Sequence, residues 1–232
     1  MRLAIMQPYF LPYIGYFQLM AAVDKFVVLD DVNYINRGWV NRNRLLLNGL
    51  PHTFTLPIRG ASQNKLICDI ELVSERNWSD KLIRTIRQAY RQAPCYAHVS
   101  ALIERLFHYP AVRLDEFLLN SLREILHYLS LEVNVVSTSR VYKNEHLKGQ
   151  ERILDICRQE QADGYINPIG GENLYDRASF LEQGIQLLFL RPRPISYPQG
   201  KGEYIPWLSI LDVLMFNEPF AVRLLLAEMD LV

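Results

Sequence analysis

The sequence has few cysteines, no excess of either charge and no long apolar run, and each of these absences excludes a class of protein. Its 3 cysteines, Cys68, Cys95 and Cys157, lie far apart without a CxxC pair, so neither a disulfide framework nor a cysteine-rich zinc site is expected. The 25 basic and 25 acidic residues cancel. A net charge of zero gives no overall electrostatic attraction for a polyanion, and we therefore expect no nucleic-acid partner.

Segments that could enter or cross a membrane are also lacking. The longest apolar stretches, Lys25–Leu29 and Leu187–Leu190, are far too short to span a bilayer. The first residues lack the longer apolar run and the small-residue cleavage site of a signal peptide. We therefore expect a cytoplasmic protein that acts on a small-molecule substrate without contacting a membrane. The 5 histidines show no metal-ligand spacing, so no metal site is predicted.

What the sequence does contain is typical of a folded α/β protein. Half of its 232 residues are hydrophobic, which is enough for a sizeable core, and a single domain is the economical interpretation. The apolar runs Arg2–Met6 and Lys25–Asp30 predict buried strands, with a helix over Pro12–Ala22 between them. A strand, a short helix and a second strand form a βαβ unit, so the two strands should be parallel.

The next segment predicts a hairpin, followed by a helical region. Arg42–Leu47 and Thr53–Ile58 are separated by Asn48-Gly49, a pair that tolerates the positive φ values of a type I′ turn. Leu66–Leu72 is expected to add a third antiparallel strand. Apolar residues at helical spacing then predict three helices, over Trp78–Ala93, Ala97–Phe107 and Leu114–Leu129.

The last third returns to alternating strands and helices. Strands are predicted at Glu132–Ser137, Gly164–Asn167 and Ile185–Leu190, and helices at Gly149–Gln161, Ala178–Gln183, Trp207–Phe216 and Pro219–Met229. The whole pattern predicts an α/β fold: a parallel Rossmann-like sheet with a β-hairpin, a helical insertion and closing C-terminal helices. In this scheme the α/β core spans residues 1–72 and 132–206, the insertion 77–130 and the final helices 207–230.

Polar and aromatic residues gather directly after the first predicted strand. Gln7, Tyr9 and Tyr13 stand where the strand gives way to a helix, and Tyr16 follows about one turn later. Ligands of parallel α/β sheets bind outside the carboxyl ends of the strands, and a helix N-terminus favours an anion. Gly15 lacks a Cβ, so another group can approach the helix closely at this position. The segment therefore predicts a binding site, although an aromatic turn that only packs would have the same composition.

A second polar cluster follows the second predicted strand. Asp30 and Asp31 are adjacent carboxylates that could hold a ribose hydroxyl, bind Mg²⁺ or act as a general base. Arg37 and Arg42 could form bidentate hydrogen bonds with a phosphate or a carboxylate. Capping of the strand end and internal salt bridges are the structural alternative. The further candidate binding residues of this cluster are Tyr34, Trp39 and Asn43.

Two other features are open to two interpretations. Gly170 and Gly171 precede a predicted helix and could expose backbone amides to an anion, with Tyr175 close by, but a plain β–α turn is equally compatible. A basic stripe on the first helix of the insertion is more typical of a solvated face, and it would matter only for a substrate with a diphosphate or a coenzyme A tail. That stripe consists of Lys81, Arg84, Arg87 and Arg91.

Several stretches resemble the WbqC-like protein family. They read QPYFLPYIGYFQL, DKFVVLDDVNYINRGWVNRN, TLPI and ISYPQGKGEYIPWLSILDVLMFN, and they extend over nearly the whole chain. Members of this family are associated with the synthesis of O-antigen and other surface polysaccharides, and an aminoacyl (glycine) transferase role has been suggested. The resemblance thus implies a bacterial enzyme of surface-sugar biosynthesis. By motif position it also singles out Tyr197, Gln199 and Asp212.

Three functions remain open at this point. The leading hypothesis is a transferase that acylates an amino group of a nucleotide-activated sugar, with Asp30 or Asp31 as general base and with Tyr13 and Tyr16 placing the acceptor. An ATP-dependent ligase or adenylyltransferase is an alternative, because Tyr13-Ile14-Gly15-Tyr16 resembles the HxGH turn of nucleotidylyltransferases with tyrosine at both histidine positions. The second alternative is a non-catalytic protein that binds a sugar-nucleotide or serves as a scaffold. The sequence specifies neither a cofactor nor an oligomeric state.

Overall fold

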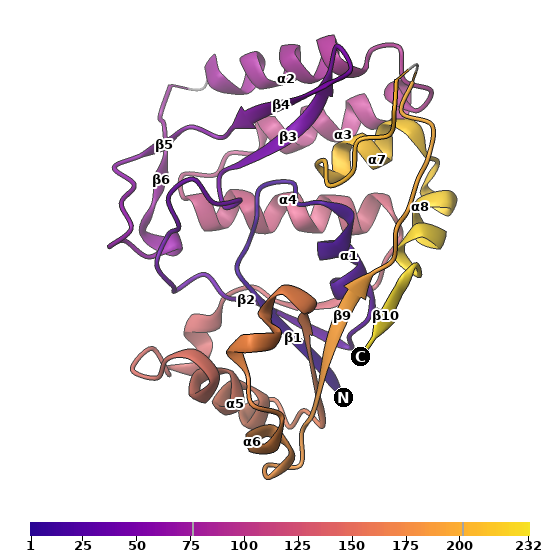
Figure 1. Ribbon diagram of the computed structural model, residues 1–232. Coiled ribbons are helices and arrows are strands. Elements are labelled where there is room, and N and C mark those ends of the chain that lie inside the picture. Colours follow the sequence, from indigo (N-terminus) through magenta and orange to yellow (C-terminus); the bar gives the residue numbers. More distant parts are fainter. Residues whose placement is uncertain (76, 201) are drawn as a thin grey trace.

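The computed structural model describes residues 1–75, 77–200 and 202–232, and its centre is a six-stranded sheet (Figure 1). The strands lie in the order β10-β9-β8-β1-β2-β7, and β10 alone runs antiparallel to its neighbour. They are β1 (Arg2–Met6), β2 (Lys25–Val28), β7 (Asn134–Val136), β8 (Gly164–Pro168), β9 (Gln186–Pro192) and β10 (Met229–Leu231). The predicted α/β fold with a largely parallel, Rossmann-like sheet is confirmed.

The first three elements form the parallel βαβ unit that the sequence predicts. Helix α1 (Ile14–Ala21) joins β1 to β2, and Leu3 of β1 pairs with Lys25 of β2. The chain next adds β7 beyond β2, and it later crosses to β8 on the opposite side of β1. The strand order therefore reverses between β1 and β8. In open α/β sheets, ligands commonly bind near such a reversal, outside the carboxyl ends of the strands.

Both faces of the sheet are buried, because successive side chains of a strand point to opposite sides. Leu3 and Ile5 of β1 belong to the core on one face, whereas Ala4 of β1 and Phe26 of β2 belong to the larger core on the other. In Figure 1, α5 and α6 lie below the sheet and α4 lies above it. The covering helices are α5 (Gly149–Gln159) and α6 (Arg177–Leu181) on the first face, and α1, α4 (Leu114–Tyr128) and α8 (Pro219–Leu226) on the second.

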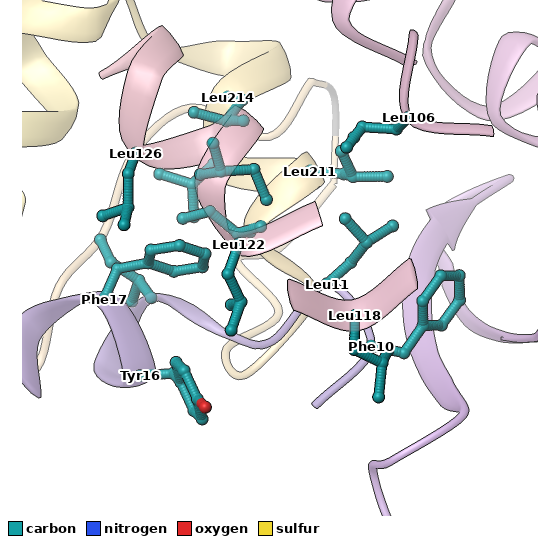
Figure 2. Packing of buried hydrophobic residues seen from close by; sticks show 14 of the residues in the cluster. Phe10, Leu11, Tyr16, Phe17, Leu106, Leu118, Leu122, Leu126, Leu211 and Leu214 are labelled. Atoms are coloured by element: carbon teal, nitrogen blue, oxygen red, sulfur yellow. The ribbon is translucent and has the colours of Figure 1, made fainter. Parts of the chain in front are cut away.

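The larger core is built around α4. Leu118, Leu122 and Leu126 recur at helical spacing and are all buried. Figure 2 shows Leu126 next to Phe17 of α1 and Leu118 next to Phe10, and Leu214 in the C-terminal part of the chain belongs to the same cluster. Each buried leucine stabilises the fold by roughly 1.5–3 kcal/mol relative to an exposed one. The remaining helices of this half are α2 (Asn77–Tyr90), α3 (Tyr96–His108) and α7 (Ile210–Phe216), so all three helices predicted for the middle of the chain are present.

The predicted hairpin is present, but its second strand begins earlier than expected. Strand β3 (Arg42–Leu47) pairs with β4 (Leu50–Thr55) through a turn whose residues Asn48 and Gly49 have φ values of 53° and 76°. The prediction placed the second strand at Thr53–Ile58. A two-residue type I′ turn forces pairing to resume at once, and that constraint decides the register.

Two further predictions need correction. Leu66–Leu72 is not a third hairpin strand: it forms the 3-10 helix η1 (Ile67–Asp69) and then the two-residue β6 (Glu71–Leu72), which pairs with β5 (Ile58–Arg59). The closing helices are also shorter than expected, and the chain ends in strand β10 after α8. The other two 3-10 helices are η2 (Ser139–Tyr142) and η3 (Ile169–Leu174). Among the described residues, no helix is both long enough and apolar enough to cross a membrane.

Candidate functional site

A small aromatic pocket lies where three segments that are distant in the sequence meet. Its volume is about 140 Å³, and it is lined by Tyr9, Pro12, Tyr13, Trp39, Asn43 and Trp207. The first three belong to the loop between β1 and α1, the next two to β3 and the segment before it, and the last to the loop before α7. Four residues that the sequence nominates for binding therefore share one cavity: Tyr9, Tyr13, Trp39 and Asn43.

The loop that carries both tyrosines is held in an uncommon conformation. Leu11 has a φ of 44°, in the left-handed region that residues other than glycine rarely adopt. Asn43 donates from Nδ2 to the carbonyl oxygens of Phe10 (3.0 Å) and Leu11 (2.8 Å). Ser209 donates from Oγ to the same Leu11 carbonyl (2.7 Å). Side chains from two other segments of the pocket thus fix the loop and preorganise its walls.

Two of the lining residues are half-exposed tryptophans, and both contact Arg44. Trp39 is 43% exposed and Trp207 is 56% exposed, and the latter has a φ of 62°. Arg44 lies with Cζ 5.6 Å from the centre of the Trp39 ring and donates from Nη2 to the Trp207 carbonyl (3.2 Å). Its buried Nε has no hydrogen-bond partner within the described part of the chain. Arg44 therefore places a positive charge against the Trp39 ring and links this ring to the backbone of Trp207.

The two tyrosines supply apolar rings and neutral hydroxyl groups. The Tyr13 ring lies over Gly15, where a Cβ would come within 2.2 Å of it, and it meets Trp207 edge to face at 5.6 Å between ring centres. Burial raises the pKa of both Tyr9 and Tyr13 above the ordinary value, so both hydroxyls stay protonated and can donate or accept. The pocket thus combines flat apolar walls with neutral hydroxyls, and one of its walls, Trp39, is in contact with the cation of Arg44.

Tyr16 and Gln7 lie deeper than the pocket. Tyr16 is 3% exposed, and its hydroxyl donates to the Gln7 carbonyl (2.9 Å). Figure 2 shows the Tyr16 ring at the border of the large core, with its hydroxyl turned away from Leu122 and Leu126. The buried Oε1 of Gln7 has no hydrogen-bond partner among the described residues. The catalytic role of Tyr16 stays a prediction, and contact with a ligand would require its present hydrogen bond to break.

The two adjacent carboxylates after β2 are buried in a network of hydrogen bonds. Asp30 is 0% exposed, and its Oδ1 accepts from Thr138 Oγ1 (2.8 Å) and from the Ser139 amide (3.1 Å). Arg140 Nη2 lies 3.2 Å from Asp30 Oδ2 and 3.2 Å from Asp115 Oδ2. Burial raises the pKa of Asp115, as expected for a carboxyl removed from water. This network connects β2 to η2 and α4.

Asp31 belongs to the same region but has its own partner. Arg152 Nη2 of α5 lies 2.6 Å from Asp31 Oδ2, and Ser139 Oγ donates to Asp31 Oδ1. Neither Asp30 nor Asp31 is among the residues that line the aromatic pocket. Their geometry corresponds to the internal salt bridges that the sequence left open as the structural alternative, and their role as general bases stays a prediction.

A third polar cluster surrounds Asp212, which is fully buried. Its Oδ1 accepts from Tyr90 (2.9 Å), and its Oδ2 accepts from Tyr197 (2.7 Å) and Gln199 Nε2 (2.7 Å). Burial raises the pKa of Asp212, and these hydrogen bonds oppose that rise. Gln199 also bonds both the amide (2.7 Å) and the carbonyl (3.0 Å) of Ile205. Asp212 thereby anchors the loop that leads to Trp207.

The remaining candidates of the second cluster stabilise the chain locally. Arg42 donates from Nε to the Gly38 carbonyl (3.2 Å) and from Nη2 to the Arg37 carbonyl. Its guanidinium is therefore engaged with the backbone of this loop, whereas the sequence predicts that it is free to bind a ligand. Arg37 itself is exposed, with a φ of 59°. Tyr34 is buried, and its hydroxyl donates to Asn41 Oδ1 (2.7 Å).

The glycine pair lies beyond β8, in η3. Gly171 packs so closely on the Asn167 side chain that a Cβ would lie 2.1 Å from Nδ2, whereas Gly170 faces open space. Tyr175 packs its ring against Tyr165, with 5.7 Å between ring centres. None of the three lines the aromatic pocket. Their proposed contact with a ligand stays a prediction.

Sequence reasoning missed residues that matter to the geometry. Trp207 stands in the quoted stretch EYIPWLSI, and an exposed tryptophan in a proline-rich loop is a signal that could have identified it. Arg44 was passed over in favour of Arg37 and Arg42. Arg152 carries no local signal, because its partner Asp31 lies 121 residues away.

Comparison with known proteins places the whole chain in one family. The profile of the WbqC-like protein family matches residues 7–224. The uncharacterized protein Rv1507c of Mycobacterium tuberculosis is 27% identical over 222 residues, which cover 93% of each chain. No solved structure gives a significant match.

Proposed function

The chain belongs to the WbqC-like protein family, and we propose that it is a transferase that acylates an amino group of a nucleotide-activated sugar. Its proposed setting is bacterial surface-polysaccharide biosynthesis in the cytoplasm, which is what the family resemblance implies. The observation that carries the proposal is the aromatic pocket, together with the guanidinium of Arg44, which lies against the ring of the pocket residue Trp39. Such a combination suits a substrate that has a ring and an anionic group.

The size of the pocket limits how much of the substrate it can hold. A cavity of about 140 Å³ is smaller than the roughly 300–1,000 Å³ typical of sites that enclose a whole ligand. We therefore propose that one ring enters between Tyr13, Trp39 and Trp207, while the rest of the substrate extends over the exposed indoles. The diphosphate would then pair with the guanidinium of Arg44.

The proposed reaction needs an acyl donor with a good leaving group, such as a thioester or an aminoacyl ester. The amine nitrogen attacks the carbonyl carbon, an amide C–N bond forms, and the bond from the carbonyl carbon to the donor sulfur or oxygen breaks. The proton that the nitrogen loses ends on the leaving group. Tyr9 and Tyr13, whose hydroxyls remain protonated, would orient the amine by hydrogen bonding.

The test combines a turnover assay with variants of the pocket. Purified protein is incubated with amino-sugar nucleotides together with coenzyme A thioesters or aminoacyl esters, and products are identified by mass spectrometry. We expect a product heavier by one acyl group, with kcat/KM at least tenfold lower in Trp39→Ala and Trp207→Ala.

A matched control is available on α8. Phe220 is exposed (66%), and its ring centre lies 5.8 Å from the Arg223 guanidinium, so it reproduces the cation contact of Trp39 outside the pocket. Phe220→Ala should leave kcat/KM unchanged. The proposal fails if no combination yields an acylated sugar and calorimetry detects no binding of any amino-sugar nucleotide.

A further inference from the structure

The three chain segments that line the aromatic pocket are joined to one another by hydrogen bonds. From β3, Asn43 Nδ2 donates to the Leu11 carbonyl in the loop between β1 and α1 (2.8 Å). From the same strand, Arg44 Nη2 donates to the Trp207 carbonyl in the loop before α7 (3.2 Å). Strand β3 thus holds both other segments, but neither of these bonds joins those two segments to each other.

Ser209, two residues after Trp207, makes that connection from a buried position. Its Oγ donates to the Leu11 carbonyl (2.7 Å), and its amide donates to the Arg44 carbonyl of β3 (2.9 Å). The Ser209 side chain is shielded from solvent, with 0% of the residue exposed. Ser209 therefore bonds the Trp207 segment to both other segments of the pocket, and its hydroxyl is the side-chain group that reaches the tyrosine loop.

The backbone that these bonds hold is strained at two places. Leu11 has a φ of 44° and Trp207 a φ of 62°. Residues other than glycine persist in this region only where the surrounding structure fixes them, and such positions cluster at ligand sites. The Leu11 carbonyl accepts from both Ser209 and Asn43. The Trp207 carbonyl accepts from Arg44. Both strained residues are thus held by side-chain donors.

We propose that Ser209 is a positioning residue of the aromatic pocket, whose hydroxyl fixes the loop of Tyr9 and Tyr13 relative to Trp207. An apolar cavity of about 150 Å³ is large enough to bind benzene, and this pocket measures about 140 Å³. A small displacement of one wall would therefore spoil the fit of a single ring. The inference rests on the proposed function only in that one ring of the substrate enters the pocket, and it does not depend on acyl transfer.

Ser209 also has a helix-capping role, which the test must separate from positioning. It is the N-cap of α7, where its Oγ accepts from the Leu211 amide (3.3 Å). Asp176 does the same for α6, where its carboxylate accepts from the amides of Ala178 (3.4 Å) and Ser179 (2.9 Å). Asp176 does not line the pocket. Asp176→Ala therefore removes an N-cap elsewhere, and both it and Ser209→Ala should lower the Tm.

The first measurement is fluorine NMR of the full chain containing fluorotryptophan, without ligand. The Tyr13 and Trp207 rings meet at 5.6 Å between centres, so a displaced tyrosine loop changes the surroundings of the Trp207 fluorine. Ser209→Ala should shift the Trp207 resonance. Trp78 is an internal control, because its Nε1 donates to the Val73 carbonyl (3.1 Å) and it does not line the pocket. Asp176→Ala should leave both resonances in place.

The second measurement titrates phenol, a single ring with one hydroxyl group, while the same resonances are recorded. We expect millimolar phenol to shift the Trp207 resonance of wild type, with an affinity at least fivefold lower in Ser209→Ala and unchanged in Asp176→Ala. The proposal is overturned if phenol does not perturb Trp207 in wild type, if Ser209→Ala leaves the ligand-free Trp207 resonance in place, or if this variant binds phenol as tightly as wild type. No acyl donor is present, so a failure of the acyl-transfer proposal would leave this result standing.

Discussion

Asp31 and Arg152 form a buried ion pair between the end of β2 and helix α5. The Nη2 and Oδ2 atoms are 2.6 Å apart, and the two side chains are 5% and 7% exposed. Arg152 also donates to the Asp31 carbonyl (3.3 Å) and to Asn144 Oδ1 (3.0 Å). Removal of one partner of such a pair leaves an uncompensated charge that is buried from solvent. Asp31 therefore has a structural role, whatever its part in a reaction.

This pair predicts that Asp31→Ala destabilises the protein strongly. We expect the free energy of unfolding to fall by about 3–5 kcal/mol, which corresponds to a drop in Tm of roughly 10 °C. A residue that served only as a general base would lose turnover without such a loss. Urea unfolding measures the change, with Arg158→Ala as control, because Arg158 pairs with Asp155 (3.3 Å) at 58% exposure and should cost under about 1 kcal/mol. An Asp31→Ala variant as stable as that control would contradict the structural role.

The second prediction concerns the hydrogen bonds that hold the loop under the aromatic pocket. Asn43→Ala removes the side-chain donor of the Phe10 carbonyl and leaves the Leu11 carbonyl with Ser209 alone, so we expect a loss of about 1–3 kcal/mol and a displaced pocket wall. The loop can be monitored without a ligand by fluorine NMR of protein that contains fluorotryptophan, in which the Trp207 resonance should shift.

A buried asparagine nearby provides the matched control for that measurement. Asn41 is 7% exposed against 4% for Asn43, and it donates to the Leu56 carbonyl (3.0 Å), outside the loop. Asn41→Ala should destabilise the protein by a similar amount but leave the Trp207 resonance in place. Equal shifts in both variants would mean that Asn43 does not hold the loop specifically.

The third prediction tests the hairpin turn. Gly49 has a φ of 76°, and an added Cβ would meet no atom within 4 Å, so Gly49→Ala changes backbone strain and not packing. We expect a destabilisation of about 1–2 kcal/mol. Gly170→Ala is the control, because Gly170 also faces open space but lies outside the left-handed region. If thermal unfolding gives the same Tm for both variants, strain in the turn is not the cause.

The fourth prediction concerns the three thiols, all of which are buried. Burial raises the pKa of Cys157 to about 12 and that of Cys68 to about 11, with Asp30 adding to the effect at Cys68. The thiolate is the reactive form, so folded protein at pH 8 should resist iodoacetamide. Mass spectrometry should find Cys68 and Cys157 unmodified until denaturant is added. Rapid labelling of either cysteine in native protein would contradict this arrangement.

Much of the sheet could be predicted, because the sequence patterns that specify its strands each lie within a short segment. The apolar runs of β1 and β2 and the Asn48-Gly49 turn each specify an element within a few residues. The aromatic pocket was partly predictable for the same reason, since Tyr9 and Tyr13 directly follow β1. Strand β10 has only three residues and is a strand because it pairs with β9. No pattern within its own short sequence predicts it.

Contacts between distant segments account for the rest. Arg152 has no recognisable partner in the sequence, because Asp31, with which it forms an ion pair, lies 121 residues away. Trp207 reaches Tyr13 because Gln199 and Asp212 anchor the intervening loop. Each of these depends on tertiary packing, which a single sequence does not encode in any short window.

The last prediction follows from Glu160 at the end of α5. Burial opposes its ionisation, but hydrogen bonds from Lys25 and from the Tyr142 hydroxyl (2.6 Å) outweigh that effect and hold the pKa of Glu160 below its ordinary value. A carboxyl whose pKa is lowered by folding stabilises the protein above its unfolded pKa, near 4.3, and loses that contribution as the pH falls through its folded pKa.

Glu160→Gln removes this contribution at every pH. The difference in unfolding free energy between wild type and the variant should therefore be largest above about pH 5 and should shrink as the pH falls below about 4. Urea unfolding between pH 3 and pH 7 gives this difference, and Glu182→Gln, an exposed carboxyl near α6, controls for the substitution itself. A difference that stays constant over the range, or grows in acid, would show that Lys25 and Tyr142 do not favour the ionised form of Glu160.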